Sequence, residues 1–213
     1  MRDGWTRTTL GEVASWQGGM TPRKSTAEFW EGGGTPWISS KEVQGGVLHA
    51  TEHAVTELAL RETTLRKLPA GSVVLVVRSG VLAHTLPVAY VPFEATVNQD
   101  VKAGIAGDTL VARYLHLLLQ ALGPELLQRY RKTGTTVQSV DFPALLKHEI
   151  RVPPLQSQRR IVDLIDAVEG GVAAARERAE AGDALRAALL AELLSGSHEI
   201  PDSYDRLLEN ARA

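Results

Sequence analysis

The sequence predicts an α+β protein in which a compact, twisted-sheet domain is followed by one long, coiled-coil-forming α-helix. Up to about residue 156, short β-branched runs alternate with glycine- and proline-rich turns, a pattern typical of a compact sheet. From about residue 158 to 194 proline is absent, and apolar residues recur at alternating spacings of four and three, as in coiled coils. We therefore divide the chain into a folded domain (1–156), a long helix (157–195) and a polar C-terminal tail (196–213).

Three strands are expected in the first part of the chain. Residues 72–77, Ser-Val-Val-Leu-Val-Val, form a near-continuous apolar run, which predicts a strand buried on both faces. Residues 86–91 and 95–97 predict two further strands. Short strands separated by turns favour a twisted sheet over alternating strands and helices.

Helices are expected after these strands. Asp108 is a candidate N-cap for a helix over 110–122, whose apolar residues recur at spacings of three and four. Gly123-Pro124 interrupts the pattern, so we expect a second helix over 125–131. Asp141 is expected to cap another short helix.

The long helix carries an apolar stripe that needs a partner. At 1.5 Å per residue the helix is roughly 55 Å long, and a small domain alone cannot bury a stripe of that length. The partner is expected to be a second copy or another subunit, although a helix folded back on its own domain stays open. Gly182 and Arg186 interrupt the stripe, and Gly196 is expected to end the helix. The candidate interface residues are Ile161, Ile165, Val168, Val172, Ala175, Ala179, Leu189 and Leu193.

Composition and charge restrict the classes of function. No apolar run is long enough to span a membrane, and residues 1–5 lack the apolar core of a signal peptide, so we expect a cytoplasmic protein without membrane contact. The absence of cysteine excludes disulfides and thiolate metal sites. Residues 1–156 carry 16 Lys and Arg against 14 Asp and Glu, while the rest carries 7 against 11. This slight basic excess means that DNA binding requires a local patch or partners that share the phosphate contacts.

Two patterns resemble catalytic motifs but do not predict catalysis. Residues 49–53 match the H-x-x-E-H pattern of a class of zinc proteases, but their context reads as loop or strand rather than the required helix. Glu94, Asp100 and Lys102 echo the arrangement in metal-dependent nucleases, and a nuclease remains an alternative. A phosphate-binding P-loop, a nucleophile elbow and a methyl-donor motif are all absent from the sequence. No metal site and no cofactor are expected.

Five blocks of sequence carry a family resemblance. They are GEV (11–13) with GGMTP (18–22); FW (29–30) with GTPWISSKEV (34–43); RSG (78–80) with AYV (89–91) and NQD (98–100); TGTT (133–136) with VPPL (152–155) and QRRIV (158–162); and LLAELLSG (189–196) with IPDSYD (200–205). Together and in this order they resemble the specificity subunits of Type I restriction-modification systems. Those subunits carry two such units, so this chain resembles a half-subunit with one.

The resemblance implies a phage-defence function without catalysis in this chain. It implies that residues 1–156 are a target recognition domain that binds one half of a bipartite double-stranded DNA sequence. It also implies that the long helix mediates homodimerisation and subunit docking. Methyltransferase (modification) subunits would methylate adenine in the site, and a motor-nuclease restriction subunit would cut DNA. The alternative from another class is a protein-interaction adaptor without DNA specificity.

Candidate DNA-binding residues lie in the glycine-rich loops. Arginine and lysine pair with guanine, while hydroxyls and backbone amides bind phosphate. A solvated surface charge is the competing interpretation for each of them. Trp30 and Trp37 are expected to pack in the core or against strands rather than to stack on bases, and Gln158, Arg159 and Arg160 are expected to make subunit contacts rather than DNA contacts. The candidates are Arg23, Lys24, Ser39, Ser40, Lys41, Arg78, His84, Lys132, Thr135 and Thr136.

Overall fold

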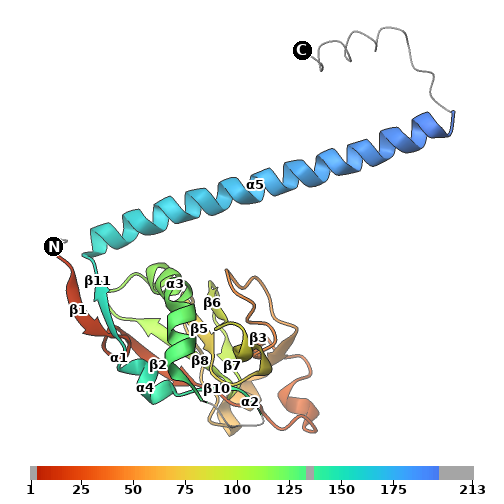
Figure 1. The fold of residues 1–213 in the computed structure, drawn as a ribbon. Helices are drawn as coiled ribbons and strands as arrows, with labels where there is room; N and C mark the ends of the chain where they lie inside the picture. The colour runs from red at the N-terminus through yellow and green to blue at the C-terminus, as the bar shows by residue number, and fades with distance from the viewer. Residues whose placement is uncertain (1–3, 133–136, 197–213) are drawn as a thin grey trace. The chain divides into compact units, whose positions relative to one another are not determined.

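The computed structural model describes residues 4–132 and 137–196, and it confirms the α+β class with a long C-terminal helix (Figure 1). The chain divides into two compact units, Met1–Val162 and Asp163–Ala213. Within the described residues, no helix combines the length and apolar character needed to cross a bilayer.

A four-stranded antiparallel sheet forms the centre of the first unit. Its strand order is β2 (Ala14–Gly18), β8 (Val101–Ala106), β5 (Ser72–Val76) and β6 (Val88–Val91). All five residues of β5 are buried, which confirms the prediction of a doubly covered strand. Alternate side chains of β5 enter two different hydrophobic clusters, as expected for a strand with a core on each face.

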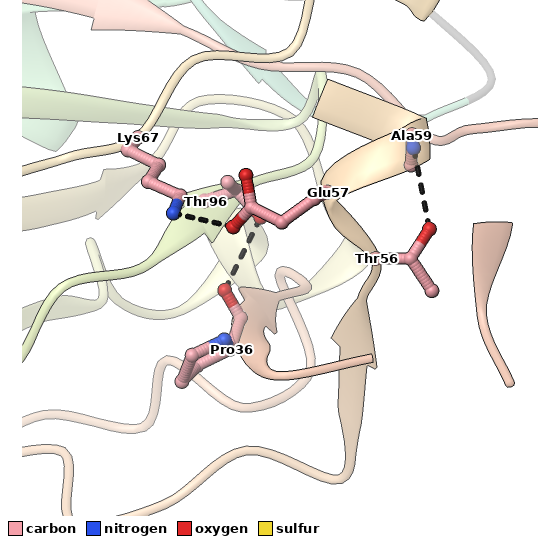
Figure 2. Close-up of polar contacts among 6 residues, drawn as sticks. All are labelled: Pro36, Thr56, Glu57, Ala59, Lys67 and Thr96. Carbon is pink, nitrogen blue, oxygen red and sulfur yellow. Dashed lines mark hydrogen bonds and ion pairs between the residues drawn. The ribbon is translucent and has the colours of Figure 1, made fainter. Parts of the chain in front are cut away.

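A smaller sheet contacts β8 through β7 (Thr96–Val97). It contains β4 (His53–Val55), β3 (Thr35–Ile38) and β7, with β3 antiparallel to β4 and parallel to β7. Thr96 is fully buried, and its hydroxyl donates to the carbonyl of Pro36 at 3.2 Å, which stabilises the pairing of β3 with β7 (Figure 2). Because β3 and β7 run in the same direction, their carboxyl ends meet at one edge of this sheet.

Helices and short 3₁₀ turns surround the two sheets. Helix α2 (Glu57–Glu62) begins at Thr56, whose hydroxyl accepts the Ala59 N–H at 3.3 Å (Figure 2). Helix α4 (Phe142–Leu146) is capped by Asp141, as predicted, through the Ala144 N–H at 3.2 Å. The remaining short elements are α1 (Leu10–Val13), η1 (Ala27–Phe29), η2 (Gly80–Ala83), β9 (Arg131–Lys132) and β10 (Ser139–Val140).

Helix α3 (Ala112–Tyr130) corrects two expectations. It packs against β5, β6 and β8 and is continuous, so the predicted break at Gly123-Pro124 is wrong (Figure 1). Its buried face continues past the proline through Leu126 and Leu127, and this packing offsets the loss of one backbone hydrogen bond. Asp108 is not the N-cap, because the helix begins after Val111.

The first and last strands of the domain are neighbours. Strand β1 (Thr6–Thr9) pairs antiparallel with β11 (Glu149–Val152), so that Thr6 lies opposite Val152. The chain therefore enters and leaves the sheet region at the same place, just before the long helix begins.

Helix α5 (Leu155–Leu194) begins inside the first unit. Gln158 is fully buried there, where its side chain accepts the Val111 N–H at 2.8 Å and donates to the carbonyls of Thr109 at 3.0 Å and Pro153 at 2.8 Å. The expected role of Gln158 in subunit contact is therefore wrong, because its polar atoms are used within its own domain. Gly196, with a φ of +71°, lies just past the end of the helix, as predicted.

The part of α5 that follows the first unit exposes its apolar residues. Val168, Val172, Leu189 and Leu193 are 55%, 46%, 47% and 37% exposed. Ile161, by contrast, is partly buried against the main hydrophobic cluster of the first unit. These four residues lie on one stripe, since their spacings follow the alternating period of the sequence. Leu164, Leu185, Leu190 and Leu194 are also exposed but lie outside it.

We predict that Gln158→Leu lowers the free energy of unfolding of the domain by at least about 2 kcal/mol, because it leaves three buried backbone groups without their partner. Chemical denaturation of the full chain measures this loss. Arg159→Leu, at the exposed neighbouring position, is the control and should change stability by less than about 0.5 kcal/mol. Equal stability of the two variants would contradict the role assigned to Gln158.

Candidate nucleic-acid interface

The turn of residues 98–100 brings the predicted binding loops together. It follows β7 directly, and the Asn98 N–H donates to the carbonyl of Ile38, the last residue of β3, at 2.9 Å. Ser39, Ser40 and Lys41 come immediately after Ile38. The parallel pairing of β3 and β7 therefore places these three predicted residues beside the turn.

Arg78 reaches the same turn from the central sheet. The backbone carbonyl of Asp100 accepts the N–H of Val77 at 2.8 Å and that of Arg78 at 3.3 Å. The Arg78 side chain is 61% exposed, and its Nε lies 4.0 Å from Oδ1 of Asp100. Among the described residues this carboxylate oxygen is buried without a hydrogen bond, and the ion pair with Arg78 compensates part of its charge. Asp100 thus holds the guanidinium at the edge while leaving it open to solvent.

The segment that carries Arg23 and Lys24 is fastened to the same edge. The Thr21 hydroxyl donates to Oε1 of Gln99 at 2.9 Å, and the Trp37 indole donates to the Met20 carbonyl at 3.0 Å. Only glycine fits where this segment begins, because a Cβ on Gly19 would lie 1.7 Å from the carbonyl oxygen of Val97. Arg23 and Lys24 are exposed.

These contacts define a surface that we call the recognition edge: residues 21–24, 39–41, 78 and 98–100. Arg23, Lys24, Lys41 and Arg78 are its exposed cations. Glu42 closes the serine-lysine loop, because its carboxylate accepts the N–H groups of Ser39 at 2.7 Å and Glu52 at 2.8 Å. The edge therefore combines positive charge with hydroxyl and amide side chains on a hydrogen-bonded backbone.

The other predicted residues lie next to this edge or outside the described chain. Lys132 belongs to β9, and its ammonium lies 3.9 Å from the Asp141 carboxylate. The Ser79 N–H donates to the Gln138 carbonyl at 3.0 Å, which connects the segment before β10 to the neighbour of Arg78. His84 is exposed at the end of η2, beside Ala83, whose carbonyl accepts from Arg131 at 2.9 Å. Thr135 and Thr136 lie outside the described residues.

Sequence reasoning missed Thr21 and Gln99 as members of the edge. The threonine hydroxyl and the glutamine amide each contain a hydrogen-bond donor and an acceptor, so both can bind a base or a phosphate. The position of Gln99 immediately after a predicted strand was the available signal. The bond between Thr21 and Gln99 joins residues 78 positions apart, and no local pattern predicts it.

The two catalytic look-alikes do not assemble into a metal centre. His49 lies in a loop and His53 begins β4, so the H-x-x-E-H residues are not on a helix. Asp100 faces Arg78, and the Lys102 ammonium lies 5.8 Å from the centre of the Phe142 ring. Over residues 4–132 and 137–196, no three His, Asp or Glu side chains are grouped so that they could hold a metal ion.

We predict that Trp37→Phe weakens the attachment of residues 20–24 to the edge, because phenylalanine keeps an aromatic ring but loses the hydrogen bond to Met20, worth about 1 kcal/mol. Amide hydrogen exchange in residues 20–24 should become faster. In Trp16→Phe, which loses an equivalent bond to the Leu10 carbonyl of 2.9 Å, exchange in this segment should stay unchanged. The same protection in both variants would show that Trp37 does not fasten the segment.

Comparisons with known proteins show the family of the chain. A family model described as the Type I restriction modification DNA specificity domain matches residues 2–180. The specificity subunit of the Escherichia coli Type I restriction enzyme EcoR124I/EcoR124II is 39% identical over 158 residues, which are 74% of this chain and 39% of that protein. The MjaIX specificity subunit of Methanocaldococcus jannaschii is 30% identical over 165 residues, which are 73% of this chain and 35% of that protein.

Solved structures show the same fold. A structure described as showing complex assembly and conformational transition of the type I R-M system covers 90% of this chain at a TM-score of 0.67 and 26% identity. The HsdS subunit of Thermoanaerobacter tengcongensis covers 82% at a TM-score of 0.61 and 24% identity. This chain spans 46% and 39% of those two chains, so it corresponds in length to less than half of either. Because the family model matches most of its residues, the protein belongs to the family of Type I restriction-modification DNA specificity domains.

Proposed function

We propose that this chain is the non-catalytic, sequence-reading component of a Type I restriction-modification complex, and that it binds one half of a bipartite double-stranded DNA site. The observation that carries this proposal is the convergence of exposed cations and hydrogen-bonding side chains from four separate segments on the recognition edge. Family membership and the two relatives described above, both specificity subunits, support the same function.

The chemistry of the edge suits DNA recognition. Arginine can donate two parallel hydrogen bonds to guanine and glutamine can pair with adenine, so Arg78 and Gln99 are the candidate base readers. Lys41 and the Ser39 and Ser40 hydroxyls are candidates for phosphate contacts, which position the protein without reading sequence. Lys67 adds little attraction, because the Glu57 carboxylate pairs with it at 2.6 Å and balances its positive charge (Figure 2). The same hydrogen bond raises the pKa of Lys67.

Catalysis then belongs to partner proteins. We assign methylation of adenine to modification subunits and DNA cleavage to a motor-nuclease subunit, with the whole complex acting on DNA in the cytoplasm. In this assignment residues 1–156 read DNA, and residues 157–195 serve dimerisation and subunit docking. The mild charge of the recognition domain is compatible with this division, since the partners can share the phosphate contacts.

The exposed stripe of α5 supports pairing with a second long helix. Exposed Val168, Val172, Leu189 and Leu193 recur at coiled-coil spacing, and small residues at Ala175 and Ala179 permit a close approach. Two copies would then hold two recognition domains on one DNA duplex, one for each half of the site.

We predict that Arg78→Ala and Lys41→Ala each weaken DNA binding by the full chain, by about fivefold or more, without unfolding it. For Lys41, the dependence of affinity on salt should fall by about one counterion. Fluorescence anisotropy with a labelled duplex between 50 and 200 mM salt measures both quantities. Arg151→Ala and Lys147→Ala replace exposed cations of β11 and its preceding turn and are the matched controls. A variant with unchanged affinity and salt slope removes that residue from the interface.

We predict that Val172→Glu converts the dimer to a monomer, because it places a charge in the apolar seam of both helices. Ala173→Glu adds the same charge at the adjacent exposed position, outside the stripe, and should leave the dimer intact. Sedimentation at micromolar concentration separates the two results. A wild-type chain that sediments as a monomer would reject the proposed dimer.

A further inference from the structure

A small pocket opens beside the recognition edge, and the contacts described above do not use it. Its volume is about 200 Å³, and it is lined by Lys24, Trp30 and His53. Two of its walls are aromatic rings, and the third residue carries a positive charge. Such a combination is typical of sites that bind bases, because every base offers a flat face for stacking and its nucleotide carries a charged phosphate.

The aromatic walls are held in place by the residues around them. The rings of Trp30 and His53 lie with centroids 6.2 Å apart and an angle of 75° between their planes. Trp37 is buried and contacts both, at 5.2 Å from Trp30 and 6.3 Å from His53. The Trp30 indole donates to the Arg23 carbonyl at 3.2 Å. The walls are therefore largely formed before any ligand arrives.

The pocket is continuous with the recognition edge. His53 lies opposite Trp37 in the β3–β4 register, close to the end of β3 where the serine-lysine loop begins. The neighbouring Glu52 N–H is bonded to Glu42, which closes that loop. Lys24 is itself a member of the edge. DNA that contacts Lys41 and Lys24 therefore passes the mouth of the pocket.

We propose that this pocket receives one unstacked base of the bound DNA, an inference that rests on the proposed DNA-binding function. The rings of Trp30 and His53 contact the base, and the Lys24 ammonium pairs with the adjoining phosphate. A methyltransferase must take its target base out of the stack, which leaves an unpaired base in the duplex and gives such a site a use.

Two labelled duplexes of the same sequence test this inference, one fully paired and one with a single extra, unpaired thymine. The full wild-type chain should bind the bulged duplex about fivefold more tightly or better, as expected for one base stacked on an aromatic side chain. His53→Ala and Trp30→Leu should bring the ratio of the two affinities close to one. His49→Ala is the matched control, because His49 is also exposed but does not line the pocket.

The outcomes separate this inference from the proposed function. His53 is exposed at the start of a strand, so His53→Ala stays informative even if Trp30→Leu disturbs the Arg23 segment. Equal binding of both duplexes by the wild type rejects the pocket but leaves DNA binding intact. A preference that survives both His53→Ala and Trp30→Leu also rejects the pocket. Failure to bind either duplex rejects the proposed function together with the inference.

Discussion

The recognition edge depends on the hydrogen bonds of one short turn, residues 98–100. Asn98 is almost fully buried, and its side chain accepts the Asp100 N–H at 3.0 Å, which closes the turn on itself. The main chain of the turn is bonded to the end of β3 at Ile38 and to the end of β5 at Val77 and Arg78. Buried backbone groups must find partners, so these bonds fix where two strands of different sheets end. The loops that carry the cations therefore start from one rigid point.

This arrangement separates the placement of the loops from their chemistry. The bonds that position Ser39 and Arg78 are made by backbone atoms and by buried side chains such as Asn98 and Thr96. The exposed side chains of Lys41 and Arg78 take no part in closing the sheets. Under the proposed function, substitutions at those positions change DNA binding while the scaffold stays the same, as is usual when binding residues lie on loops of a rigid framework.

The sequence predicted the elements whose signals are local. Strand β5 was recognisable because a run of consecutive apolar, mostly β-branched residues is typical of a strand that is buried on both faces. Asp141 was recognisable as a helix cap because its hydrogen-bond partner lies only three residues away. Local rules were wrong at Pro124, where packing of α3 on the sheet outweighs the lost hydrogen bond. They were also wrong at Gln158, whose partners Thr109 and Val111 come from another part of the chain.

The same limit applies to the interface. The candidate cations were found because charged residues stand out in glycine-rich loops, but their convergence required the parallel pairing of β3 with β7, which joins residues about 60 positions apart. The role of Gln99 depends on that pairing as well. The pocket beside His53 could not be predicted, because its walls come from three segments whose spacing in sequence carries no period.

The pairing of β1 with β11 has a consequence for how such proteins can change over generations. Because the domain begins and ends on adjacent strands, with Thr6 opposite Val152, the recognition edge is contained in a segment whose two ends lie side by side. Exchange of genetic material between related genes could replace that whole insert at its base. The long helix would stay unchanged, and under the proposed function the bound DNA sequence would change in one recombination event.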